Sequence, residues 1–267
     1  MNTVNRAIPA LFALAIMSGC GGGLGSTVEL PVTMGADVYR ISDLTNIDRF
    51  TRNRQMVRFG TEGGFADSAP QSGDFRVWVN GTAMVFEQEG VYTASAGIVA
   101  GAQFGFQVDT KDGTAHGTVL MPTPSLSVIS PPKDSVVSNS QSLSVTWAEV
   151  ASDSARISVF AADEDNQPTS LLYSGATSSD STFVIPTAQM SLLPPGPVVL
   201  MVAVISSGSL ESDGQVRFGN GSYVEAADVD IRPITIAIGA STMAAPAAQP
   251  SPDQSSWRYL FSTADGE

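Results

Sequence analysis

Short runs in which apolar and polar residues alternate are the feature that most constrains how this chain can fold. Between Phe75 and Val79 the apolar residues fall at every second position, which predicts a strand with one buried face and with Trp78 on the more exposed face. Asn80-Gly81 separates this run from a second one, and such a pair is the strongest short hairpin signal because both positions require a positive φ. The sequence therefore predicts an all-β fold.

Similar runs along the chain predict further strands, each short and bounded by residues that favour turns. Val198 to Ile205 is wholly apolar, and eight residues suit a buried strand. The expected strands cover residues 36–41, 90–94, 103–108, 114–120, 126–129, 143–147, 157–160, 183–185 and 198–205.

The composition limits the class of protein. Charged residues make up 15% of the chain, against about 25% in typical globular proteins, and the net charge is −13. An acidic balance of this size argues against a nucleic-acid partner. The 267 residues are enough for one or two domains with buried cores.

The N-terminal residues 1–19 have the pattern of a signal peptide. Ala7 to Met17 is an apolar run that follows Arg6, and eleven residues fit a signal-peptide hydrophobic region, whereas a spanning helix needs about 20. Met17-Ser18-Gly19-Cys20 then resembles the lipobox of bacterial lipoproteins, with Met17 where Leu is usual. The resemblance implies cleavage before Cys20 and acylation of Cys20 by chains such as palmitate. The alternative is an ordinary cleaved signal peptide with a chance cysteine.

Residues 20–27 would form the lipidated cysteine and a flexible tether. Gly21 to Ser26 is Gly-rich and reaches at most about 20 Å, so the first domain is expected close to the lipid surface. The residue after Cys20 is Gly21 rather than Asp, and by resemblance to the sorting rules of Gram-negative lipoproteins this favours the outer membrane. We therefore expect a lipid-anchored protein of the bacterial cell envelope, in the outer membrane.

Residues 28–122 are expected to form an N-terminal Ig-like β domain. The order Gly-Val-Tyr, Gly-Ala-Gln-Phe-Gly-Phe-Gln-Val and Lys-Asp-Gly-Thr resembles small Ig-like domains of bacterial surface lipoproteins over residues 75–122. Met121-Pro122-Thr123-Pro124 then marks a boundary, because proline fixes φ and restricts its neighbour.

Residues 123–243 are expected to form a second β-sandwich. Ser-Leu-Ser-Val-Thr-Trp, ending at Trp147, resembles the second strand of a fibronectin type III domain, and this implies a buried Trp147. Residues 206–223 look like an insertion into that pattern. Pro233 interrupts the closing strands, which predicts a strand at a sheet edge or one with a bulge, because proline donates no ladder hydrogen bond.

The C-terminal residues differ in composition from both domains. Residues 244–256 are rich in Ala, Pro and Ser and predict a disordered linker, and residues 257–267 begin with an aromatic, strand-like segment. Trp257, Tyr259 and Phe261 share one face of a strand and are candidates for partner binding. The segment either packs back onto a domain or adds to a sheet edge of a partner.

Five of the thirteen basic residues lie close together in the sequence: Arg40, Arg49, Arg52, Arg54 and Arg58. They either form a solvated face that balances nearby acids or contact anionic lipid head groups near the tether.

Candidate catalytic groups are few. His116 is the only histidine and follows a turn, so an exposed hairpin residue is favoured over a catalytic one. A lipidated Cys20 lacks the thiolate that cysteine catalysis needs. Zinc ligands of the usual kind are too few, and no cofactor is expected.

Carboxylates offer two further possibilities. Asp163 and Asp165 lie between two strands and could ligate Ca²⁺, but the run lacks EF-hand spacing and a solvated acidic loop is favoured. Asp228 and Asp230 alternate along a strand, so we expect both to face water. The favoured function is non-catalytic binding, assembly or structure in the envelope, with a protein or glycan partner. The alternative is a carboxylate-based hydrolase or a carbohydrate-active accessory protein.

Overall fold

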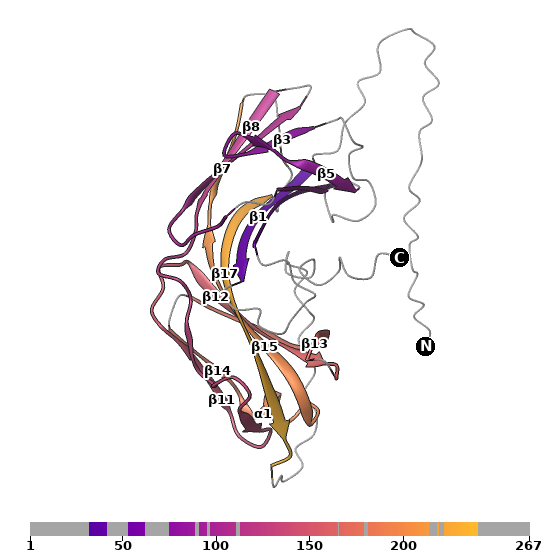
Figure 1. Cartoon of the computed structure of the whole chain (residues 1–267), viewed down its shortest axis with the longest axis vertical. Coiled ribbons are helices and arrows are strands. Elements are labelled where there is room, and N and C mark those ends of the chain that lie inside the picture. Colours follow the sequence, from indigo (N-terminus) through magenta and orange to yellow (C-terminus); the bar gives the residue numbers. More distant parts are fainter. Residues whose placement is uncertain are drawn as a thin grey trace, which may run out of the picture. The chain divides into compact units, whose positions relative to one another are not determined.

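The computed structural model describes residues 32–41, 53–61, 75–88, 91–94, 97–110, 113–164, 166–178, 181–213, 218 and 222–239. In these residues the chain is all-β apart from one short helix, α1 (Thr187–Met190) (Figure 1). The predicted all-β fold is therefore confirmed. No helix in the described ranges has the length and apolarity needed to cross a membrane.

The described strands form one large sheet and two smaller ones. The large sheet contains, in spatial order, β13 (Pro168–Ser178), β12 (Ser154–Ala162), β15 (Gly196–Ser207), β17 (Tyr223–Ala237), β1 (Val32–Ile41), β2 (Asn53–Thr61), β6 (Val91–Ala94) and β5 (Val85–Gln88), and β10 (Val136–Ser138) also pairs with β17. The second sheet contains β14 (Thr182–Ile185), β11 (Leu143–Trp147) and β9 (Val128–Ser130). The third contains β16 (Ser209–Ser212), β8 (Gly113–Leu120), β7 (Gln103–Thr110), β3 (Arg76–Val79) and β4 (Thr82–Ala83).

Each small sheet packs against a different part of the large sheet, so the described chain contains two β-sandwiches. The first core joins β3, β7 and β8 to β1, β6 and β17, and Phe106 and Met34 are among its buried side chains. The second core joins β9, β11 and β14 to β12, β15 and β17. Trp147 is buried there, as predicted, and Trp78 is more exposed than its neighbours Val77 and Val79.

The turn at Asn80-Gly81 has the conformation that the sequence predicts. Asn80 has a φ of 48° and Gly81 a φ of 76°, and the flanking residues Val79 and Thr82 are register partners in the β3–β4 pair. Local signals therefore set this hairpin.

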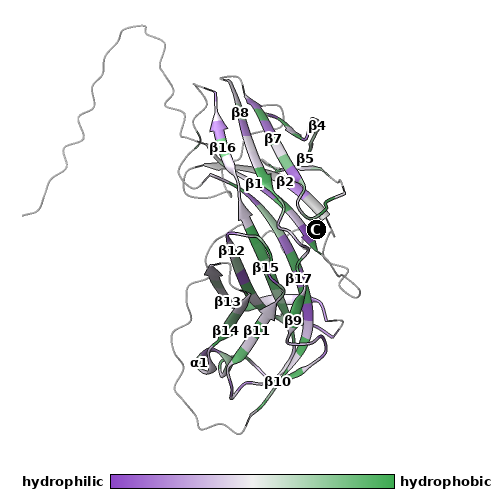
Figure 2. Ribbon diagram, turned by 90° about the vertical axis from the view of Figure 1, so that its left-hand side faces the viewer, coloured by the Kyte–Doolittle hydropathy of each residue, from purple (hydrophilic) through white to green (hydrophobic). Residues whose placement is uncertain are grey.

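β17 joins the two sandwiches, because its 15 residues contribute to both cores. Figure 2 shows β15 and β17 running side by side, and they pair from Gly196↔Ile236 to Ser207↔Glu225. The predicted insertion also contributes to the first sandwich, since β16 pairs with β8 from Ser209↔Thr118 to Ser212↔Ala115. The division at residue 122 into independently folding domains stays a prediction, whereas the shared sheet is observed.

Pro233 corrects a prediction, since β17 is a central strand with an unbroken register to β15. On its other side β17 pairs with β1 as far as Val229 and with β10 from Thr235. Between them, the Asp134 N–H donates to the carbonyl oxygen of Pro233. The nitrogen and oxygen of a strand residue face the same side, so the missing N–H of Pro233 falls in the gap between β1 and β10.

Candidate functional site

The face of β17 that meets the two cores changes from apolar to ionic and back to apolar along its length. A strand places every second side chain on one face. On this face the first core receives Val224 and Ala226, the second core receives Ile234 and Ile236, and the residues between them are Asp228, Asp230 and Arg232. The charged side chains therefore lie where the two cores meet.

Asp228 is fully buried and paired with Arg40 of β1. Arg40 Nε donates to Asp228 Oδ1 at 3.1 Å, and Arg40 Nη2 donates to Asp228 Oδ2. Asp228 Oδ2 also accepts the backbone N–H of Leu126 at 2.7 Å. Two parallel N–H donors from one guanidinium give a strong, directional pair.

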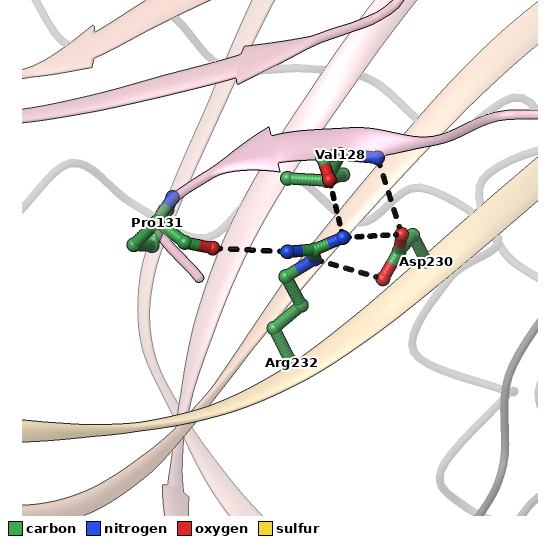
Figure 3. Close-up of polar contacts among 4 residues, drawn as sticks. All are labelled: Val128, Pro131, Asp230 and Arg232. Atoms are coloured by element: carbon green, nitrogen blue, oxygen red, sulfur yellow. Dashed lines mark hydrogen bonds and ion pairs between the residues drawn. The ribbon is translucent and has the colours of Figure 1, made fainter. Parts of the chain in front are cut away.

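Asp230 and Arg232 form the second half of the arrangement, shown in Figure 3. Arg232 Nε lies 3.2 Å from Asp230 Oδ1, and Asp230 Oδ2 accepts the N–H of Val128 at 3.3 Å. Arg232 Nη1 donates to the carbonyl oxygen of Pro131 at 3.1 Å, and Arg232 Nη2 donates to that of Val128. The guanidinium thus bonds a carboxylate and two backbone carbonyls together.

These four side chains, Arg40, Asp228, Asp230 and Arg232, are called the ionic junction below. Asp228, Asp230 and Arg232 bind the backbone of residues 126–131, the stretch that enters the second sandwich after the first sandwich ends. Two positive and two negative charges balance, which suits a buried site where an unpaired charge is expensive. The junction therefore holds this connecting stretch against β17.

The junction corrects two expectations. Asp228 and Asp230 are 0% and 5% exposed, so they do not face water. The Arg40 side chain is 13% exposed and paired, so it is not available as a lipid-contacting residue. Arg49 and Arg52 lie outside the described residues, as do the side chains of Arg54 and Arg58.

The junction has the donors and acceptors of a structural clamp. A carboxylate pair in a glycosidase needs one group to donate a proton to substrate and the other to reach the anomeric carbon or a water. Here each carboxylate accepts an arginine and a backbone amide. The pair Asp228 and Asp230 is therefore occupied by the protein itself.

The other candidate groups are separate from the junction and from one another. His116 is exposed on β8, opposite Gln107 and Glu211 in the register. Asp163 Oδ1 accepts the N–H of Gln167 at 2.8 Å, which makes it part of a turn, and Asp165 lies outside the described residues. In the described part of the chain, no three His, Cys, Asp or Glu residues gather as a metal site would require.

β13 forms one edge of the large sheet and is a second candidate site, separate from the ionic junction. Among the described strands it pairs with β12 alone, and from Tyr173↔Val159 to Ser178↔Ser154 this pairing is regular. None of its residues, Pro168 to Ser178, is charged. Natural edge strands usually carry lysines, prolines or bulges that prevent further pairing. Here Pro168 and the register shifts around Phe160 protect one end, and the regular part has no such device.

Sequence reasoning missed Arg232 and β13. A signal for Arg232 was present, because it continues the alternation of Val224, Ala226, Ile234 and Ile236, all of which are buried. For β13 the only local signal was the short apolar run Leu171-Leu172-Tyr173, which lacks alternation. Cys20, Trp257, Tyr259 and Phe261 lie outside the described residues, so their predicted roles stay predictions.

Comparisons with known proteins add little. No family model matches the sequence, and no curated protein matches it. Solved structures with some likeness include Dpr11 IG1 bound to DIP-gamma IG+IG2, at 6% identity, covering 78% of this chain and 98% of that chain. A second is DIP-gamma IG1+IG2, at 8% identity, covering 78% and 97%. Both have a TM-score of 0.19, too low to carry an argument.

Proposed function

We propose that this protein is a non-catalytic, lipid-anchored binding protein of a bacterial outer membrane, and that its partner adds an extended segment to the edge of β13. One observation carries the binding proposal. The regular part of β13, from Tyr173 to Ser178, is an uncharged edge that pairs on one side only among the described strands. Strand addition uses backbone hydrogen bonds for affinity and alternate side chains for specificity.

The residues around this edge support a protein partner. Asp163 and Glu164 precede β13, and the whole chain has a net charge of −13. An acidic surface attracts a partner with basic residues around its docking strand and increases the association rate. No observation of the described residues favours a glycan, and the occupied carboxylates of the ionic junction argue against a hydrolase that uses Asp228 and Asp230.

The edge is tested with charge substitutions on the purified, membrane-anchored protein. Ala176→Lys and Ser178→Lys place a charge at exposed positions of the edge. Ser144→Lys makes the same kind of change at an exposed position of β11, which has strands on both sides. A partner recovered from envelope extracts should bind wild type and Ser144→Lys alike and be lost from the edge variants. Equal recovery by all variants would show that the partner does not use β13.

The anchor is tested separately. We expect the mature chain to begin at an acylated Cys20 and to partition into detergent, and Cys20→Ala to release a soluble or unprocessed form. Two or more long chains hold a protein on a membrane stably, at about 0.8 kcal/mol per buried methylene. An intact mass that shows an unmodified N-terminus at another residue would contradict the anchor and leave the edge proposal intact.

A further inference from the structure

The large sheet has a second buried face, on the side opposite the two cores. Its members are Tyr39, Ile41, Phe160, Val199, Met201, Ala203, Ile205, Ala227, Val229 and Ile231. They alternate along β15 and β17 with the residues of the two cores. All ten are between 0 and 6% exposed. β15 is therefore buried on both faces.

Every member of this second face comes from strands of the large sheet: β1, β12, β15 and β17. Side chains that lie side by side on a sheet still leave their outer ends open to water unless another layer covers them. Met201 and Ile231 are register partners on this face, and each is 1% exposed. A single chain buries them, so the covering layer belongs to this chain.

We propose that the C-terminal aromatic segment, Trp257 to Phe261, docks on the second face and supplies that layer. Its three aromatic residues occupy alternate positions, which puts three rings on one face of an extended segment. Each buried aromatic ring removes a large apolar area from water. The segment thus has the apolar chemistry that a second layer needs.

The second face carries small side chains near its centre, at Ala203 and Ala227. Ala203 pairs with Val229, and Ala227 pairs with Ile205 on one side and Tyr39 on the other. The two alanines are small residues among larger neighbours, so a flat ring can pack closer to the sheet there than over a larger side chain. Tyr39 and Phe160 add aromatic partners for edge-to-face contacts.

The chain is long enough for this return. β17 ends at Ala237, and residues 238–256 reach at most about 60 Å when extended. The 15 residues of β17 span about 50 Å. The aromatic segment can therefore reach any point along β17, including Ala227 near its start. The proposal concerns this intramolecular contact and is independent of the partner at β13.

Oxidation of methionines in the full-length mature protein tests the proposal. Met201 lies on the second face, whereas Met190 lies in the second core. The triple substitution Trp257→Ser, Tyr259→Ser and Phe261→Ser should raise the oxidation rate of Met201 about tenfold and leave Met190 protected, because undocking opens one face only. An unchanged rate at Met201 would overturn the proposal.

Two further experiments test the same proposal and do not depend on the folding of the triple variant alone. A photoreactive benzoylphenylalanine in place of Tyr259 should cross-link within one chain to the peptides that contain Met201 or Val229. Cross-links between two chains, or to other regions only, would overturn the proposal. The second experiment substitutes Leu44, Ile47 and Phe50 by Ser and leaves the tail intact. If this variant exposes Met201 to oxidation while the tail variant leaves Met201 protected, residues 42–50 form the covering layer and the proposal is overturned.

Discussion

Arg40 and Asp228 lie opposite each other in the parallel β1–β17 pair and join their side chains in an ion pair, although 188 residues separate them in the sequence. Backbone register and side-chain charge thus specify the same alignment. A shift of β1 by one residue would put Arg40 on the other face of the sheet and leave Asp228 buried without a cation. The ion pair therefore selects one register among the possible alignments.

Breaking this pair should destabilise the protein strongly. Asp228→Asn leaves the Arg40 guanidinium without its counter-charge, and loss of one partner of a buried pair costs about 3–5 kcal/mol. Asp213→Asn makes the same chemical change at an exposed position and should alter the free energy of unfolding by less than about 0.5 kcal/mol. Urea denaturation measures both variants. Equal stabilities for the two would mean that the pair contributes nothing.

Arg232→Lys should also destabilise, although the charge is kept. A lysine ammonium cannot bond Asp230 and the carbonyls of Val128 and Pro131 with the fixed geometry of a guanidinium. We expect a loss of about 2 kcal/mol and faster hydrogen exchange at the Val128 amide. The exposed Arg76→Lys is the matched control. Unchanged exchange at Val128 would show that Arg232 does not hold the connecting stretch.

Gly117→Ala should crowd the contact between β8 and β17. A Cβ at residue 117 would lie 2.8 Å from Val224 Cγ2 and 3.4 Å from the carbonyl oxygen of Ser209. Such overpacking costs about 1–3 kcal/mol, and adding Val224→Ala should restore part of the loss. Gly97→Ala, which meets no atom within 4 Å, is the control. The explanation fails if thermal unfolding gives the two glycine variants the same stability.

Tyr173 gives a pH-dependent prediction. Burial raises the pKa of the Tyr173 phenol above its ordinary value of 10.0, because the folded state disfavours the phenolate. The Tyr173 phenol therefore keeps its proton to a higher pH in the folded state than in the unfolded state. The contribution of the Tyr173 phenol to the free energy of unfolding is therefore complete below about pH 10. It is lost as the pH rises through the pKa of this phenol in the folded state.

The measurement compares wild type with Tyr173→Phe, which has no phenol to ionise. Between about pH 9 and pH 11 the free energy of unfolding of wild type should fall relative to that of the variant. Parallel stability curves over this range would contradict the expected titration. The substitution keeps the aromatic ring at residue 173, whose centroid lies 6.4 Å from that of Phe183 in wild type, so the packing of the two rings changes little.

Local sequence signals predicted the strands better than their long-range partners. The Asn80-Gly81 turn and the strand ending at Trp147 follow from a few adjacent residues, and both are observed. The parallel pairing of β1 with β17 has no local signal, because its two strands come from opposite ends of the described chain. The shared large sheet could therefore not be predicted from periodicity.

The ionic junction shows why a sound local rule gave the wrong answer. Polar residues at alternate strand positions usually face water, and Asp228 and Asp230 follow that pattern. Burial became possible because Arg40 approaches from β1 and the amides of Leu126 and Val128 approach from the connecting stretch. None of these partners can be recognised before the topology is known.

The pairing of β1 with β17 also determines how late in synthesis the first sandwich can be completed. Asp228 stands 188 positions after Arg40, so a ribosome that adds 5–20 residues per second reaches it roughly 10 to 40 s later. During that interval β1 lacks one of its two neighbours, and the apolar side chains of Met34, Ala36 and Val38 lack Val224 and Ala226. The first sandwich to be synthesised is thus completed only when the last strand of the described chain has been made, so vectorial, domain-by-domain folding cannot finish it.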